Sequence, residues 1–357
     1  MFSTRQLLFG IAVFIGGSSL FTIFITQITF QDSWFSALLA LLLSFLIIAV
    51  YIALVRRFPA QGLLQMHMTV YGKTLGRFLN IFYTLFCLLF TAMNLRNLGD
   101  FFKGFIMTET PLLVVLSLIT ITCALLARGG ITLILRNAFL FFVFMTIALL
   151  TNSLLLIPNM RFSNFFPVLQ MGLAAYGKAA FVLASAPFCE ILVFLILLPY
   201  ADPKADIRKS FLWGLLLGGF YLLLTFVRDI ACLGTALSYL TEPTYETVRL
   251  INLMDIFSRL EIVYAFTLIV MRVFKLSVLF CAIVRCVEDV HGKPIEARGL
   301  CLSVIGIATV CAALFLFETG ITLPEWFRNT GAYIFAVFEM AVPLLTLLVA
   351  LLRRKRA

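Results

Sequence analysis

The sequence predicts an all-α integral membrane protein with ten transmembrane helices, arranged as a 5+5 inverted repeat in which helices 1 and 6 are broken. Three observations support this prediction. Hydrophobic residues make up 62% of the 357 residues, charged residues make up 12%, and the mean hydropathy is +1.09. This composition leaves too little polar surface for a soluble globule. Ten apolar runs are long enough to cross about 30 Å of hydrocarbon, and the first and sixth runs are interrupted by helix-breaking residues.

The ten apolar runs occupy most of the chain and are joined by short loops, so we expect one transmembrane domain over residues 1–357. The two sets of five follow from the number of runs and from the matching positions of the two interruptions. The runs lie at about residues 6–28, 33–55, 78–104, 111–127, 135–157, 173–199, 211–237, 257–284, 299–317 and 333–352.

The distribution of basic residues predicts the orientation of the chain. Most of the 27 Lys and Arg residues lie in the segments that would be cytoplasmic if the N-terminus is cytoplasmic, whereas the opposite segments hold Arg161, Lys178, Arg249 and Arg328. Because Lys and Arg concentrate in cytoplasmic loops, we expect both termini in the cytoplasm. The net charge of +10 therefore follows topology. We expect the basic residues 353–356 to contact anionic membrane lipids rather than nucleic acid.

Small residues and one proline interrupt two of the apolar runs. In lipid, an unpaired backbone group costs several kcal/mol, so unwound chain survives only where it lines a cavity or meets a ligand. Paired breaks in the two halves of a transporter point to a substrate site near the midplane, where a half-helix N-terminus suits a carboxylate. The alternative is close helix packing through small residues. The predicted substrate-binding residues are Gly16, Gly17, Ser18 and Ser19 in the first run and Ser185, Ala186 and Pro187 in the sixth.

Buried charges near these breaks are further candidates for the site. Glu190 follows Pro187 within one turn, and a carboxylate at this depth needs a cation or a cavity. It could bind a substrate ammonium, pair with a protein cation or carry a transported proton; a static ion pair is the plainer alternative. Arg272 and Lys275 are three residues apart and share a helix face. We expect carboxylates to be their partners, although Lys275 could instead extend toward the cytoplasmic face. The intramembrane carboxylates available are Glu190, Asp229 and Glu339.

Two groups of charged residues near the outer ends of helices are predicted to form a gate or a structural cluster. Arg96, Asp100 and Lys103 lie at helical spacing in the third run, and Arg259 and Glu261 lie at the start of the eighth. Charges at such spacing neutralise one another locally. A structural role or an outer vestibule is therefore favoured over contact with substrate.

Four other polar residues in or near the apolar runs carry weaker signals. Arg228 and Asp229 are neighbours that point to different faces of their helix, so we expect each to pair elsewhere. His67 and His291 lie in expected inner loops, where we expect solvated or interfacial side chains. The sequence has no phosphate-binding glycine loop, no nucleophile with a histidine partner and no metal-ligand spacing. We therefore expect no enzymatic activity, no metal and no cofactor.

Short motifs in a fixed order resemble the endospore germination permease family. This family comprises the B subunits of nutrient-germinant receptors of spore-forming Firmicutes and belongs to the amino acid/polyamine/organocation superfamily. An acidic position that the family has shortly after Arg136 is replaced here by Ala138 and Phe139. The motifs are Ser3-Thr4-Arg5-Gln6, Arg57-Phe58-Pro59, Gly72-Lys73-Thr74-Leu75-Gly76, Arg128-Gly129-Gly130-Ile131, Asn164-Phe165-Phe166-Pro167-Val168, Phe188-Cys189-Glu190, Asp255-Ile256-Phe257-Ser258-Arg259-Leu260-Glu261 and Phe274-Lys275.

The resemblance implies a LeuT-like fold that holds a nutrient, most simply an amino acid, between helices 1 and 6. It implies a germinant-receptor subunit in the inner membrane of the spore, beside a larger A-type membrane subunit and a C-type lipoprotein subunit. In sodium-driven relatives the ion lies between helices 1 and 8, where the ammonium of Lys275 could stand in for it. The alternatives to a germinant sensor are a proton-coupled amino acid permease that uses Glu190 and a water or ion conduit opened by germinant.

Overall fold

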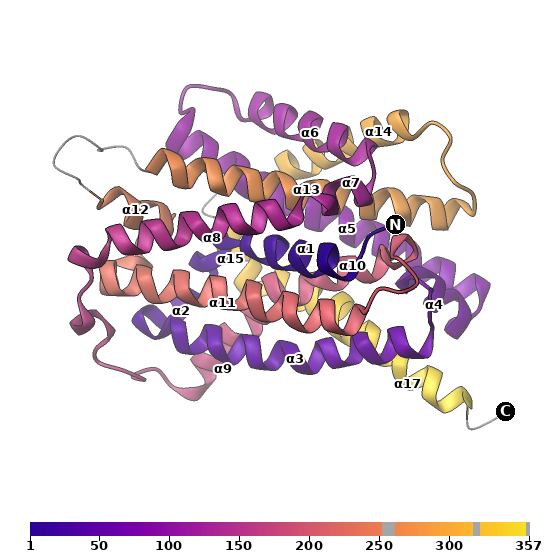
Figure 1. Ribbon diagram of the computed structural model, residues 1–357, viewed down its shortest axis with the longest axis horizontal. Helices are drawn as coiled ribbons and strands as arrows, with labels where there is room; N and C mark the ends of the chain where they lie inside the picture. Colours follow the sequence, from indigo (N-terminus) through magenta and orange to yellow (C-terminus); the bar gives the residue numbers. More distant parts are fainter. Residues whose placement is uncertain (252–260, 317–321, 355–357) are drawn as a thin grey trace.

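The computed structural model describes residues 1–251, 261–316 and 322–354, and these residues form helices joined by short loops (Figure 1). Within them, eight helical stretches are long and apolar enough to cross a membrane. Two shorter apolar helices, Thr4–Gly16 and Leu112–Arg128, accompany these stretches. The prediction of an all-helical membrane protein is confirmed, while the count of ten spans stays a prediction. The eight stretches are Ile23–Arg57, Lys73–Ile106, Ala138–Leu155, Leu173–Ile196, Ile207–Ser238, Glu261–His291, Arg298–Phe315 and Thr322–Arg353.

In the first half of the chain, the first predicted span is two helices with a break between them. Helix α1 (Thr4–Gly16) is followed by the 3-10 turn η1 (Ser19–Thr22) and by α2 (Ile23–Thr29). A loop helix, α4, separates the second and third predicted spans. The remaining helices of this half are α3 (Ser33–Arg57), α4 (Leu63–Tyr71), α5 (Lys73–Phe101), α6 (Leu112–Arg128), α7 (Ile131–Arg136) and α8 (Ala138–Leu155).

In the second half, the sixth predicted span is interrupted in the same manner. Helix α9 (Leu173–Leu183) leads into the π-helical turn η6 (Ala184–Phe188), in which Ala186 has non-helical angles of φ −145° and ψ 115°. The last helical stretch contains two further π-helical turns: η10 (Phe327–Gly331) precedes the tenth predicted span, and η11 (Val337–Ala341) lies within it. The remaining helical elements are η7 (Cys189–Leu192), α10 (Val193–Ile196), α11 (Ile207–Leu233), α12 (Pro243–Arg249), α13 (Glu261–His291), α14 (Arg298–Phe315), α15 (Thr322–Trp326), α16 (Ala332–Ala336) and α17 (Val342–Arg354).

Local signals in the sequence explain where α1 begins and why it packs closely. The Ser3 hydroxyl accepts from the Gln6 amide while the Gln6 side chain accepts from the Ser3 amide, which is a capping box. Along its length α1 packs on α11 at Gly214 and Gly218. A methyl group at either glycine would come within 2.7 or 2.8 Å of the Cβ of Ile11 or Ile15. This Gly-xxx-Gly spacing lets two helix backbones approach in a membrane.

Both ends of the described chain lie toward the same end of the long axis of the molecule (Figure 1). The N-terminal segment is fixed there by backbone hydrogen bonds. The Phe2 amide donates to the Tyr200 carbonyl at 3.0 Å, and the Asp202 amide donates to the Phe2 carbonyl at 2.9 Å. This arrangement agrees with two termini on one side of the membrane, and which side that is stays a prediction.

Candidate functional site

The ammonium of Lys275 joins the two helix breaks. Its Nζ donates to the Ser18 hydroxyl at 2.5 Å, beside the first break, and forms an ion pair with Glu190 Oε2, just after the second. Lys275 comes from α13, the eighth predicted span. The side chains of Lys275 and Glu190 are both 0% exposed. Three residues predicted separately from the sequence thus form one buried cluster, which we call the Lys275 cluster (Ser18, Glu190 and Lys275).

Aromatic rings enclose the Lys275 ammonium. Its Nζ lies 4.8 Å from the centre of the Phe14 ring and 5.3 Å from that of Phe90, and the negative faces of such rings attract a cation. Phe194 packs edge-on against Phe14 with ring centres 5.3 Å apart. The interpretation in which Lys275 extends to the cytoplasmic surface is wrong, because its ammonium points to the helix breaks and is closed off from water.

Arg272, one turn before Lys275, is held by amides of α5. Its Nη1 donates to Asn94 Oδ1 at 2.7 Å and its Nη2 to Asn97 Oδ1 at 2.8 Å. Sequence reasoning looked for carboxylate partners and missed both asparagines. Two amides three residues apart in an apolar run are nevertheless a visible signal, because polar side chains there usually bond across helices. Glu339, another expected partner, is buried, and its carboxylate oxygens have no hydrogen-bond partner among the described residues.

The other residues predicted at the breaks divide into packing residues and polar residues. A methyl group added at Gly17 would lie 3.0 Å from the Met271 carbonyl oxygen, and one at Gly16 would lie 2.9 Å from Met145 Sδ. The two glycines therefore allow close packing. The hydroxyls of Ser19 and Ser185, by contrast, are buried polar groups without a hydrogen-bond partner of standard geometry among the residues that the structure describes. Ala186 and Pro187 are fully buried in the turn η6.

A cavity of about 540 Å³ is lined by residues of α2, of α15 and of the end of α5, at the end of the molecule opposite the termini. Asn97, which binds Arg272, lines it together with Asp100, Lys103 and Glu242. Of the predicted gate residues, Arg96 pairs with Asp100 at 2.9 Å and Lys103 is exposed at the cavity wall. Glu261 is half-buried at the start of α13, and Arg259 lies outside the described residues. Burial raises the pKa of the Glu242 carboxyl well above its usual range.

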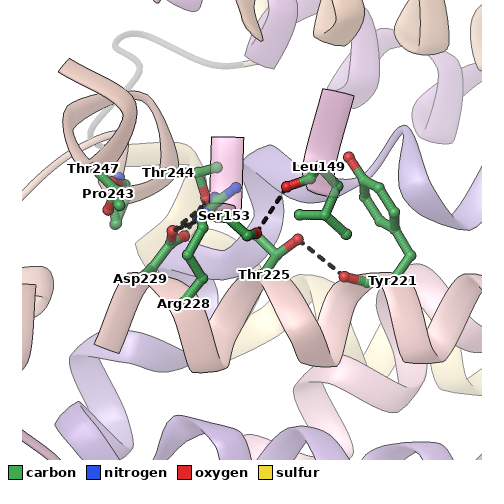
Figure 2. A network of polar contacts seen from close by, with 9 residues as sticks. All are labelled: Leu149, Ser153, Tyr221, Thr225, Arg228, Asp229, Pro243, Thr244 and Thr247. Atoms are coloured by element: carbon green, nitrogen blue, oxygen red, sulfur yellow. Dashed lines mark hydrogen bonds and ion pairs between the residues drawn. The ribbon is translucent and has the colours of Figure 1, made fainter. Parts of the chain in front are cut away.

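Arg228 and Asp229 pair with each other, contrary to the sequence-based expectation. Arg228 donates to Asp229 Oδ1 through Nε at 2.9 Å and through Nη2 at 2.7 Å. The other carboxylate oxygen accepts from the Thr244 hydroxyl at 2.6 Å. Figure 2 shows Thr244 on the loop helix α12 directed toward Asp229 on α11. The expectation failed because helix-face geometry fixes only Cβ directions, and the long arginine side chain folds back over its neighbour.

His67 is fully buried in the protein, so the expectation of a solvated or interfacial histidine is wrong for this residue; His291 is exposed, as expected. His67 Nδ1 donates to Asn80 Oδ1 at 2.8 Å, and Asn80 Nδ2 donates to Asp289 Oδ2 at 2.6 Å. The chain of contacts ties the loop helix α4 to α5 and α13. Burial lowers the pKa of His67 from 6.5 to about 4, although the bond to Asn80 opposes this change.

The lowered pKa of His67 predicts a loss of stability in acid. As the pH falls from 6.5 toward 4, the unfolded chain takes up a proton at this histidine while the folded protein does not. Proton binding therefore stabilises the unfolded state relative to the folded state. At 1.36 kcal/mol per pKa unit, the free energy of unfolding should fall by about 2 kcal/mol between pH 6.5 and 5. Thermal unfolding of purified protein over this range should show the loss in the wild type and in His291→Asn. It should be much smaller in His67→Asn, and equal slopes in all three would contradict the assignment.

Comparisons with known proteins show which sequences this chain is similar to. The family model described as spore germination protein matches residues 1–319. Spore germination protein KB of Bacillus subtilis (strain 168) is 24% identical over 361 residues, covering 99% of this chain and 95% of that protein.

Two solved transporters share the fold. Mhp1, a nucleobase-cation-symport-1 family transporter in a closed conformation with bromovinylhydantoin bound, has a TM-score of 0.58 at 11% identity, over 93% of this chain and 79% of its own. A manganese transporter of Eremococcus coleocola has a TM-score of 0.50 at 14% identity, over 97% and 78%. At such identities the likeness shows the fold alone, and it confirms the LeuT-like architecture.

Proposed function

Since the chain belongs to the spore germination protein family, we propose that it is the B-type subunit of a nutrient-germinant receptor, which binds an amino acid between its broken helices and signals to partner subunits. Family and fold make it a multi-pass membrane receptor or transporter rather than an enzyme. The finer proposal places it in the inner membrane of the spore with both termini cytoplasmic. It also includes an A-type membrane subunit and a C-type lipoprotein subunit as partners.

The observation that carries the proposal is the Lys275 cluster. It offers an ammonium and a carboxylate side by side in a buried site between the two breaks, which are the charges complementary to the two ends of a zwitterionic amino acid. The buried hydroxyls of Ser19 and Ser185 add neutral hydrogen-bonding groups. The carboxylate of the ligand would pair with the Lys275 ammonium, and the ammonium of the ligand would pair with the Glu190 carboxylate.

A ligand in this position would separate Lys275 from Glu190, which gives binding a means of changing conformation. The ion pair joins α13 to η7, and Ser18 joins both to the first break. A ligand bound between Lys275 and Glu190 would replace their contact with each other by contacts with the ligand. The arrangement of the helices with the ion pair closed and the arrangement with it open would therefore bind the ligand with different affinities. Such a difference is the only way in which a ligand can shift a conformational equilibrium. The pair also supplies a fixed cation between helices 1 and 8, which argues against sodium coupling.

Germinant would enter from the cavity at the end opposite the termini. That cavity reaches Asn97, whose side chain holds Arg272 one turn from Lys275. The Lys275 cluster itself is closed to solvent, so a germinant would reach it only after the surrounding helices move apart. We propose that the Arg96–Asp100 pair stabilises the wall of this entrance, with Lys103 at its rim.

The second candidate is a proton-coupled amino acid permease, and the buried Glu190 carboxylate favours it. An intramembrane carboxylate that exchanges between a lysine and a ligand can also exchange a proton. The two candidates make different predictions for flux, since a sensor needs only a shift between conformations whereas a permease must release the amino acid on the other side.

Binding and uptake should be measured on the same purified protein. We expect one or a few amino acids to raise its thermal unfolding temperature, with a stabilisation of about 2.7 kcal/mol at 100 times the Kd. In proteoliposomes with a pH gradient, we expect no accumulation of the same radiolabelled amino acid. Ser18→Ala should weaken binding, whereas Ser303→Ala, which removes an exposed hydroxyl bonded to its own helix, should not. Accumulation of the amino acid that is lost when the pH gradient is removed would favour the permease. Equal binding by Ser18→Ala and Ser303→Ala would mean that the amino acid binds elsewhere.

A further inference from the structure

A cavity of about 850 Å³ lies between α3, α11 and α17, at the end of the molecule that carries both termini (Figure 1). It is separate from the Lys275 cluster and from the cavity at the opposite end. Three arginines line it: Arg56 and Arg57 at the end of α3, and Arg208 in the first turn of α11. No carboxylate is among the described residues that line it.

The wall of this cavity changes from charged to apolar with depth. Ile52 lies one turn before Arg56 on α3, and Leu212 lies one turn after Arg208 on α11, so both are deeper in the membrane than the arginines. Leu351 adds an apolar side chain from α17. A charged rim above an apolar wall is the arrangement that accommodates an amphiphile with an anionic head.

The three arginines place positive charge at this rim. Arg57 is fixed in place because its Nη2 donates to the Ala350 carbonyl at 3.2 Å, while Arg56 and Arg208 are exposed. Three guanidinium groups that share one cavity repel one another, and a phosphate can accept paired hydrogen bonds from each. A free peptide or nucleic acid would satisfy the charges but would leave the apolar wall uncovered.

We propose that this cavity binds an anionic phospholipid, with its phosphate on Arg56, Arg57 and Arg208 and its acyl chains along Ile52, Leu212 and Leu351. Basic pockets between transmembrane helices are suited to such head groups. The lipid joins the ends of three helices that are far apart in the sequence. It also bears on the nutrient site, because the hydroxyl of Tyr51, next to Ile52, donates to the Glu339 carbonyl at 2.5 Å and lies 3.3 Å from the carbonyl of Cys189, the residue before Glu190.

The test measures lipid binding to the purified full-length protein by native mass spectrometry and by thermal unfolding in detergent. Dioleoyl phosphatidylglycerol is the probe and dioleoyl phosphatidylcholine the neutral comparison. We expect the wild type to bind and be stabilised by phosphatidylglycerol preferentially. At about 1 kcal/mol per basic residue near anionic lipid, the triple variant R56Q/R57Q/R208Q should bind it about 100-fold more weakly. The single variant R208Q changes an exposed residue and can be tested even if the triple variant does not fold. It should bind phosphatidylglycerol about fivefold more weakly than the wild type.

The matched control is K73Q/K204Q/K293Q, which removes the same charge from exposed positions that do not line the cavity; it should keep the preference for phosphatidylglycerol. Equal binding of the two lipids by the wild type would overturn the proposal, and so would equal losses in the two triple variants. Inorganic phosphate distinguishes the source of the anion. If millimolar phosphate without lipid stabilises the wild type as strongly as phosphatidylglycerol does, the site binds free phosphate and the lipid assignment is wrong.

Discussion

Replacing Lys275 with methionine is expected to lower the free energy of unfolding by about 3–5 kcal/mol, because it leaves Glu190 as a buried charge without its cation. Glu190→Gln should cost a similar amount by leaving the ammonium uncompensated. The double variant should recover most of the loss, since replacing a buried ion pair with uncharged groups is often neutral. Methionine suits this test because its side chain can pack between the Phe14 and Phe90 rings.

Denaturant or thermal unfolding of the four proteins forms a double-mutant cycle that isolates the pair. The exposed pair Arg249–Glu246, with an N–O distance of 3.0 Å, provides the control. A cycle of Arg249→Met and Glu246→Gln should give a coupling below about 1 kcal/mol, because solvent screens exposed charges. Equal coupling in the two cycles would contradict the burial of the Lys275 cluster. A double variant as unstable as the single ones would mean that each charge also makes a contact of its own that the other cannot replace.

The same double variant separates folding from function. If the Lys275 cluster receives the two ends of an amino acid, a refolded Lys275→Met/Glu190→Gln protein should lose thermal stabilisation by amino acids while its unfolding remains cooperative. Retained stabilisation at the same ligand concentration would place the nutrient elsewhere. If the pair is only structural, the double variant keeps its stabilisation by amino acids; if the pair is a ligand site, that stabilisation is lost although the protein still folds.

The breaks could be predicted from the sequence, but the contacts between them could not. Glycines, serines and a proline inside long apolar runs are local signals, and they marked both broken helices. Lys275, however, meets Ser18 across 257 residues and Glu190 across 85. Which buried cation meets which carboxylate depends on how helices pack, and one sequence offered several possible carboxylate partners for the same cation. The rest of the site therefore needed the structure.

The wrong expectations share a physical cause. His67 was expected at a solvated or interfacial position because hydropathy places α4 between two spans, yet burial of a loop helix is decided by the helices beneath it, here through Asn80 on α5. Gly214 and Gly218 on α11 have the spacing of a helix-packing motif, but that spacing does not indicate that α1 is the helix that packs against them. Local patterns thus indicated where helices begin and break, and tertiary contacts decided which polar groups are enclosed.

The contacts of Asp229 predict a second large loss of stability on mutation. Its charge balances Arg228 and its hydrogen bond to Thr244 holds α12, and two variants can separate these roles. Asp229→Asn keeps the shape of the side chain and an acceptor for the Thr244 hydroxyl but leaves Arg228 as a buried cation. We therefore expect a loss of about 3–5 kcal/mol in the free energy of unfolding. Thr244→Val keeps both charges and removes the one hydrogen bond that joins α12 to α11 at this point (Figure 2). Its cost should be about 1.5–3 kcal/mol, since the acceptor is charged.

Hydrogen exchange distinguishes these two roles, because a tether protects its own segment beyond what global stability provides. In Thr244→Val, amides of α12 should exchange faster than the change in global unfolding explains, whereas in Asp229→Asn all slowly exchanging amides should speed up together. The control is Thr247→Val on the same helix, whose hydroxyl donates only to the Pro243 carbonyl of its own turn in the contacts described; its effect should stay small. If Thr247→Val opens α12 as much as Thr244→Val does, packing rather than the bond to Asp229 holds this loop helix. Selective opening in Thr244→Val would instead show that one buried carboxylate both balances Arg228 and anchors α12 beside the entrance that Glu242 lines.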